Sequence, residues 1–153
     1  MRIAVFASFA VFALALAGCS GQPSFQGQWT IERVEAAPWV EAGFAPDASI
    51  AGLYVGKAVA FKSDAIEGPG LLACAHPRYT FEEVPAEGLF QGSLAGSHRD
   101  TAGAETAARK LGFAPPVKTM MTGCEHDIAF HMRDEDHAAF ALDNMIFWMV
   151  RAR

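Results

Sequence analysis

The chain has 153 residues, of which 52% are hydrophobic, and a formal net charge of −5 at pH 7. A mildly acidic chain without a cluster of Lys and Arg is a poor match for nucleic acid or for anionic lipid headgroups, so we expect neither as a partner. The sequence has no internal repeat and no heptad pattern, and its length fits one domain.

The first 18 residues have the composition of a secretory signal. Arg2 supplies positive charge, and the apolar run Ile3–Ala17 is too short to cross a membrane as a helix. The segment Leu16-Ala17-Gly18-Cys19 resembles the lipobox of bacterial lipoproteins, in which the cysteine is acylated and the chain is cut just before it. This resemblance implies a signal peptide at 1–18 and a lipid such as palmitate on Cys19, which would act as a membrane anchor. The alternative is an ordinary secretory signal that happens to contain a cysteine.

The residues after the lipobox indicate where the mature protein works. Ser20 stands where enterobacterial lipoproteins retained in the inner membrane tend to have Asp, so we expect the outer membrane, facing the periplasm. Residues 19–24 would form a tether, and residues 25–153 a single globular domain. In this oxidising compartment the two remaining cysteines, Cys74 and Cys124, predict a disulfide. Two free buried thiols are the alternative.

The globular part begins with a pattern typical of a strand at Phe25–Val34. Period-two alternation places Trp29 and Ile31 on one face, and we assign Arg33 to the same face. The pair Gly27-x-Trp29 resembles the opening strand of lipocalin-like barrels, in which the Trp closes the barrel floor. A plain core Trp is the alternative.

The middle of the chain predicts a loop, short strands and one helix. The prolines in Ala36–Ile50 indicate an ordered loop. The helix has Asp100 or Thr101 as a cap and Gly112 as a stop. The predicted strands are Leu53–Phe61, Ala65–Glu67, Leu71–Cys74 and Tyr79–Val84, and the helix is Ala102–Leu111.

The last third predicts a three-stranded antiparallel meander. Its strands are Glu125–Arg133, His137–Leu142 and Met145–Arg151. Short turns would set two cross-strand rows, one of Phe130, Phe140 and Phe147 and, on the opposite face, one of His131, Ala139 and Trp148. Both faces are apolar, so the second face needs a cover: the helix, a long loop or a partner.

Several segments, taken in order, resemble the META domain of small bacterial envelope proteins. They are Gly27-Gln28-Trp29, Phe61, Ile66-Glu67-Gly68, Cys74, Tyr79 and Thr119-Met120-Met121-Thr122-Gly123-Cys124. Ala73 and Ala75 flank Cys74 where that family usually has Gly and Asn. The resemblance implies a compact fold and brings no catalytic residues. We predict an α+β fold, mainly antiparallel sheet curled toward a barrel, with one short helix packed on it.

No residue pattern predicts catalysis or a bound cofactor. His126 and His131 differ by an odd number, so they would face opposite ways on a strand, and we expect no metal site. Asp134-Glu135-Asp136 could bind calcium through oxygens, but turn chemistry explains the run equally well. The chain lacks a Gly-x-Ser-x-Gly segment and a phosphate-binding glycine loop. We therefore do not expect an enzyme.

A group of aromatic and histidine side chains is the candidate binding surface. Aromatics with few charges are used by ligand pockets and by interface cores, although most of these residues could also be plain core. The candidates are Trp39, Phe44, Tyr79, Phe90, His131 and Trp148. We expect a non-enzymatic, envelope-anchored lipoprotein that binds a periplasmic protein or a small apolar ligand. The alternative is a hydrolase acting on cell-envelope substrates.

Overall fold

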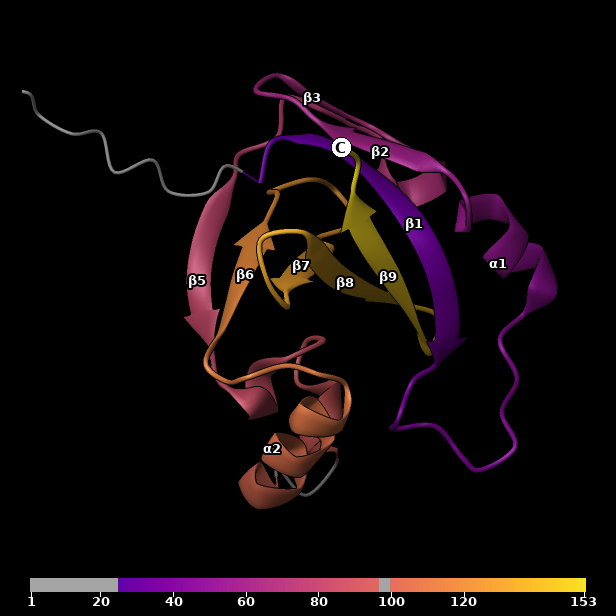
Figure 1. The fold of residues 1–153 in the computed structure, drawn as a ribbon, viewed down its shortest axis with the longest axis vertical. Coiled ribbons are helices and arrows are strands. Elements are labelled where there is room, and N and C mark those ends of the chain that lie inside the picture. Colours follow the sequence, from indigo (N-terminus) through magenta and orange to yellow (C-terminus); the bar gives the residue numbers. More distant parts are fainter. Residues whose placement is uncertain (1–24, 97–99) are drawn as a thin grey trace, which may run out of the picture.

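The computed structural model describes residues 25–96 and 100–153. This part folds into a nine-stranded antiparallel sheet that curls into an open half-barrel (Figure 1). The expected α+β class with a dominant antiparallel sheet is confirmed. The lipobox with Cys19 and the tether lie outside the described residues, so the signal peptide and the lipid remain predictions. Within the described ranges, none of the helices is both long and apolar enough to cross a membrane.

The strand order across the sheet is β4-β3-β2-β1-β9-β8-β7-β6-β5. In chain order the strands are β1 (Gly27–Ala36), β2 (Ala58–Phe61), β3 (Ala65–Glu67), β4 (Cys74–Ala75), β5 (Thr80–Val84), β6 (Val117–Met121), β7 (Ala129–Met132), β8 (His137–Leu142) and β9 (Met145–Arg151). The helices are α1 (Ala48–Tyr54) and α2 (Thr101–Lys110), with 3-10 turns η1 (Gly70–Leu72), η2 (Ala86–Gly88) and η3 (Ser93–Ala95). Because α1 is a second α-helix, the expectation of one helix is corrected.

The inner side of the half-barrel is filled by aromatic side chains. Phe140 pairs with Phe147 in register, and their rings stack with centroids 5.1 Å apart. Phe130 continues the row, with its ring 5.5 Å from that of Phe140. The predicted Phe130–Phe140–Phe147 row is confirmed. Trp29 joins this inner core and is fully buried.

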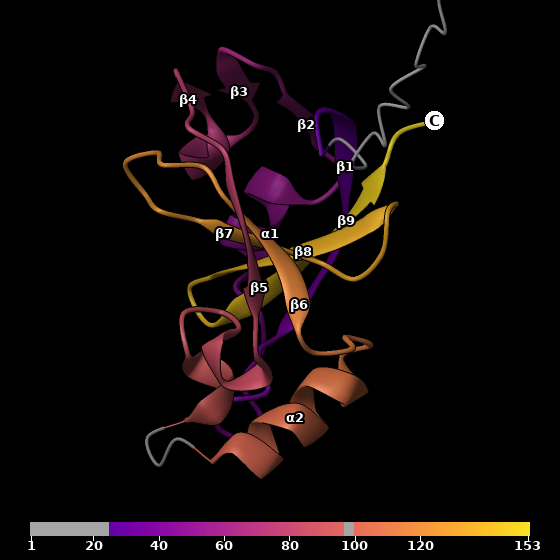
Figure 2. The same ribbon diagram turned by 90° about the vertical axis from the view of Figure 1, so that its left-hand side faces the viewer.

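The outer side of the meander carries a second core. The predicted row of His131, Ala139 and Trp148 is confirmed by the register of β7, β8 and β9. Segments from η2, η3 and α2 pack on this face, and α2 lies at one end of the sheet (Figure 2). Trp148 stacks on Phe113, with ring centroids 5.7 Å apart. The chain itself therefore covers the second apolar face.

A β-bulge in β1 changes the face of one predicted residue. The register between β1 and β9 shifts between Ile31 and Arg33. Ile31 and, beyond the bulge, Val34 pack in the inner core. Arg33 instead lies outside, with its guanidinium 4.6 Å from the Trp148 ring centroid. The assignment of Arg33 to the Trp29 face is wrong, because a bulge adds one residue to the alternation.

Part of the predicted strand Leu53–Phe61 is helical. Helix α1 begins after Asp47, whose carboxylate accepts hydrogen bonds from the backbone N–H groups of Ser49 at 2.7 Å and Ile50 at 3.3 Å. The pKa of Asp47 is lowered first by the Ser49 hydroxyl, which donates to the same carboxylate at 2.6 Å, and then by these two backbone bonds. This is an N-cap, which satisfies backbone donors that a helix start leaves free. Only β2 remains of the predicted strand.

The segments around the two cysteines also differ from prediction. Leu71 and Leu72 of the predicted strand Leu71–Cys74 belong to the 3-10 turn η1, and β4 holds only Cys74–Ala75. Strand β7 begins at Ala129 rather than Glu125, because the chain first turns at Cys124, whose carbonyl accepts the N–H of Asp127 at 3.1 Å. Strand β6 was not predicted. The Cys74–Cys124 disulfide is present, with Cα atoms 6.1 Å apart.

Candidate functional site

Four of the six predicted surface residues come together in the outer core. Trp39 lies 5.4 Å from Phe90, and Phe90 lies 4.6 Å from His131, measured between ring centroids. Trp148 joins them through Phe113. Phe90, His131 and Trp148 are only 1–3% exposed, whereas Trp39 is half-buried. Trp39 is therefore the member that a partner could touch, and the other three support it from below.

The remaining two predicted residues lie elsewhere. Tyr79 packs at the edge of the inner core, and its hydroxyl donates to the Lys62 carbonyl at 2.8 Å. Burial raises the pKa of Tyr79 to about 12. Phe44 lies in the loop before α1 and is 39% exposed. The six residues do not form one surface.

His131 is fixed in one neutral form. Its Nε2 accepts the backbone N–H of Phe90 at 3.0 Å, so in the neutral ring Nδ1 carries the proton and donates to Thr119 Oγ1 at 2.8 Å. The Thr119 hydroxyl donates onward to the Val117 carbonyl at 3.2 Å. Burial lowers the pKa of His131 to about 4.

The bond from Phe90 to His131 has a structural purpose. Phe90 and Gln91 both have φ of 53°, a left-handed conformation that costs energy for residues other than glycine. The hydrogen bond to the buried imidazole holds this turn in place and directs the following η3 toward α2. His131 thus acts as a buried scaffold residue.

Two adjoining hollows follow the outer surface of α2. One has a volume of about 420 Å³ and the other about 540 Å³, and they share Pro38, Gly103 and Ala107. We call them together the α2–Trp39 groove. Its lining residues are Pro38, Trp39, Ser93, Leu94, Ala95, Gly96, Asp100, Ala102, Gly103, Ala104, Thr106, Ala107, Lys110 and Leu111.

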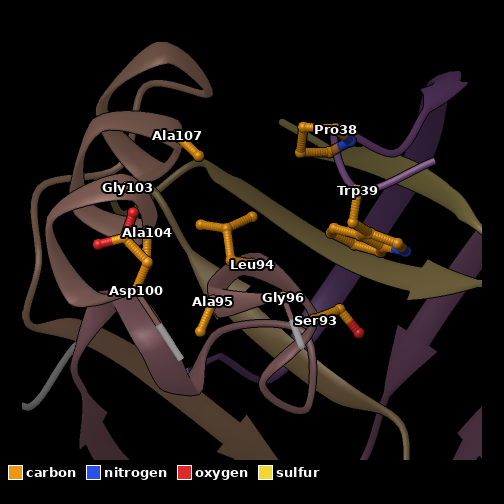
Figure 3. Close-up of a pocket in the computed structure, with 10 residues that line it drawn as sticks. All are labelled: Pro38, Trp39, Ser93, Leu94, Ala95, Gly96, Asp100, Gly103, Ala104 and Ala107. Carbon is orange, nitrogen blue, oxygen red and sulfur yellow. The ribbon is translucent and has the colours of Figure 1, made fainter. Parts of the chain in front are cut away.

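The walls of the groove differ in character. Figure 3 shows Gly103, Ala104 and Ala107 on the helix side, with Trp39 facing them across Leu94. The small helix residues leave open the space that longer side chains would fill. The Trp39 indole N–H donates to Asn144 Oδ1 at 3.3 Å. Together with the Phe90 contact, this bond fixes the position of the indole ring.

The two ends of the groove carry opposite charges. Asp100 lies at the N-terminal end of α2 and Lys110 in its last turn, and both are exposed. The Asp100 carboxylate folds back over Gly103, where an added Cβ would lie 2.5 Å from Asp100 Oδ2. A glycine at 103 is therefore what allows the carboxylate to lie along the rim.

Outside the groove, one exposed pair of polar side chains could also act on a ligand. His137 Nδ1 lies 2.7 Å from Asp134 Oδ1 on the exposed β7–β8 turn. Partial burial raises the pKa of Asp134, but hydrogen bonds from His137 and from the Asp136 backbone, with the His137 charge, outweigh that effect and lower the pKa overall. In residues 25–96 and 100–153, no group of three or more His, Cys, Asp or Glu side chains is arranged to hold a metal ion.

No protein-family model, no curated protein and no solved structure matches this chain. The likenesses to a lipoprotein signal and to the META domain remain predictions. The function must therefore be argued from the groove itself.

The sequence predicted the aromatic wall of the groove, Trp39, but not the small residues of η3 and α2. The signal that could have indicated them is Gly103 inside an alanine-rich helix, where glycine costs stability unless something approaches closely.

Proposed function

We propose that this protein is a non-enzymatic binding protein of the bacterial envelope, anchored through lipid on Cys19 and facing the periplasm. Its partner is another envelope protein, which engages the α2–Trp39 groove. The observation that carries the proposal is an open groove with a fixed aromatic wall on one side and small helix residues on the other. Ser20, in place of the Asp that is typical of inner-membrane retention, supports an outer-membrane location.

Side chains fill the inside of the half-barrel, so a ligand is not expected to bind there. Trp29, Phe140 and Phe147 fill the concave side and have no exposed surface. The hollow beneath the disulfide has a volume of about 10 Å³, which is at the lower limit for a single water molecule. Within the described residues, a small ligand would therefore bind in a surface hollow, and the two hollows of the groove are larger than the one of about 280 Å³ beside Lys118.

The walls of the groove suit a protein segment. A tryptophan that is already held in place loses little conformational freedom on binding, which is why such residues dominate interface energies. Gly103, which is exposed, and Ala107, which is half-buried, allow the partner backbone to approach α2 closely. A small apolar ligand is the second candidate, because the hollow volumes fall within the range of small-molecule pockets.

A hydrolase remains the alternative from another class. His131 is hydrogen-bonded on both ring nitrogens inside the core, so it is not available to a substrate. The His137–Asp134 pair is accessible and is the place at which an acid–base role would be sought. Loss of an envelope hydrolysis activity in a His137→Gln variant would favour this alternative.

The proposed partner is tested by crosslinking in the intact envelope. Wild-type protein is compared with Ala107→Tyr, which fills the groove from an accessible helix position, and with Trp39→Ala. The control is Leu53→Ala on α1, a 60% exposed residue outside the groove. We expect one dominant protein at near-equal stoichiometry with wild type and the control, and its loss with both groove variants. Equal capture by Ala107→Tyr would rule out the groove as the binding surface.

A further inference from the structure

Within residues 25–96 and 100–153, strand β5 is one edge of the half-barrel. It pairs with β6 on one side and ends the strand order. Among the described residues, β6 is its only strand partner, and Thr80 to Glu83 are exposed. The outer side of such a strand presents backbone N–H and C=O groups to which another strand can bind.

The two edge strands of the sheet, β4 and β5, differ in length and in how they are held. At the opposite edge, β4 has only two residues and is held by the Cys74–Cys124 disulfide. Strand β5 has five residues and carries Phe81, a large apolar side chain that is 42% exposed. Natural edges are usually shortened, covered or given inward charges. Strand β5 carries one such charge, Glu83, but it has five residues, and these leave a longer backbone edge for pairing than the two residues of β4.

The register fixes the side chains that an added strand would meet. Phe81 lies opposite Met120, which belongs to the inner core, so Phe81 and Glu83 project to the inner side. Glu82 lies opposite the buried Thr119 and projects to the outer side. Lys118 of β6 lies opposite Glu83, and its ammonium is 4.8 Å from the Phe81 ring centroid, so an added strand would meet Phe81 and Glu83 beside this cation on the inner side. On the outer side it would meet Glu82, which is exposed.

A second copy of this chain is a poor occupant. An antiparallel pair that used all five residues of β5 would centre on Glu82 and place Glu82 opposite Glu82. Like charges directly opposite are destabilising in a sheet. The net charge of −5 adds repulsion between two copies.

We propose that β5 accepts an extended basic segment of another envelope protein as an additional strand. The segment carries Lys or Arg beside Glu82 and Glu83 and an apolar residue beside Phe81. For an antiparallel strand this order is basic, basic, apolar along the chain. Main-chain hydrogen bonds supply affinity and the alternating side chains supply specificity. The proposal does not depend on the α2–Trp39 groove, which β5 does not line.

The test uses synthetic peptides and the whole mature chain in detergent. The probe is fluorescently labelled Thr-Val-Lys-Lys-Phe-Thr-Val, and the control peptide has Glu-Glu in place of Lys-Lys. Fluorescence anisotropy gives the Kd of each peptide for wild type and for a Glu82→Lys/Glu83→Lys variant. We expect the Lys peptide to bind wild type about tenfold or more tightly than it binds the variant, and the Glu peptide to show the opposite preference. The two glutamates are exposed, and unchanged thermal unfolding will confirm that the variant is folded.

Backbone pairing is separated from simple charge attraction by N-methylated peptides. In an extended peptide, alternate backbone N–H groups point to opposite edges. One version of the Lys peptide is methylated on the N–H groups of one edge, and a second version on those of the other edge. We expect one version to lose binding and the other to keep it. Equal binding of both versions would overturn the proposal in favour of surface charge attraction. Absence of saturable binding, or a dimer of the wild-type chain that the Lys peptide does not dissociate in ultracentrifugation, would also overturn it.

Discussion

At the scale of single residues, the most informative side chain is His131. Sequence reasoning placed it on the correct face of the meander but considered it for binding. In the structure its two ring nitrogens join β6 to the left-handed turn at Phe90. Protonation would place an N–H on Nε2 against the N–H of Phe90, so the fold requires the neutral ring.

This requirement predicts how stability depends on pH. The pKa of His131 is about 4 in the folded protein and about 6.5 in the unfolded chain, so the unfolded state binds the proton first as pH falls. The stabilisation is complete above pH 6.5 and is lost between pH 6.5 and pH 4, by about 3 kcal/mol in total. Urea unfolding across this range will measure the loss. His131→Gln should flatten the profile, whereas His137→Gln should not. An NMR titration of His131 with a midpoint near 6.5 would contradict the prediction.

Trp148 is the second residue with a large expected effect. It is buried, stacks on Phe113, and donates its indole N–H to Glu35 Oε1 at 2.9 Å. Trp148→Ala should lower the free energy of unfolding by about 3–5 kcal/mol, because it leaves a cavity in the outer core. Trp148→Phe keeps most of the packing and should cost less. Chemical denaturation checks both, and an unchanged stability for Trp148→Ala would show that the outer core tolerates the cavity.

At the scale of elements, α2 was predicted to within one residue at each end. Its C-terminal end could be located because a glycine, Gly112, stops the helix. Gly112 has a φ of 85° and donates to the Arg109 carbonyl at 3.0 Å, while Phe113 donates to Ala108 at 2.9 Å. This pair of bonds is a Schellman motif. It turns the chain so that Phe113 stacks on Trp148.

Replacement of Gly112 tests this helix end. Gly112→Ala should cost about 1–2 kcal/mol, because a residue with a Cβ is strained in the left-handed conformation. The added Cβ would also lie 3.2 Å from Arg133 Cδ. The matched control is Gly52→Ala within α1, where an added Cβ has open space, and it should be neutral or stabilising by up to about 1 kcal/mol. Equal effects of the two changes on urea unfolding would contradict this account.

Elements with local signals were predictable, and those set by distant contacts were not. The Phe130–Phe140–Phe147 row followed from turn length and period-two alternation. The bulge after Ile31 and the strand identity of β6 depend on neighbours far along the chain. The α1 start had a local signal, Asp47 as a cap, that the surrounding prolines obscured.

The candidate site was less predictable than the fold. Trp39 could be singled out by its type, but the groove beside it is formed by small residues from separate segments, such as Ala95 and Ala107. Small residues give no signal in a hydropathy pattern. Their effect is to leave space, which is visible only when α2, η3 and the Trp39 loop are placed together.

At the scale of the whole molecule, the disulfide joins distant parts of the sheet. Cys74 lies in the edge strand β4, and Cys124 follows β6, the neighbour of the other edge strand. A separation of 50 residues predicts a loss of about 3–4 kcal/mol in the Cys74→Ala/Cys124→Ala variant. Urea unfolding of that variant and of the reduced wild-type protein should agree. If both are as stable as the oxidised protein, the bond does not contribute to the closure of the half-barrel.

The same bond has a consequence for proteolysis. The segment between the two cysteines contains β5, η2, η3, α2 and β6, so it holds one edge strand and the helix side of the groove. A single cut within this segment leaves both fragments covalently joined, and they separate only after reduction. A protease that nicks this region would therefore leave a protein of two pieces that still migrates as one chain until the disulfide is reduced.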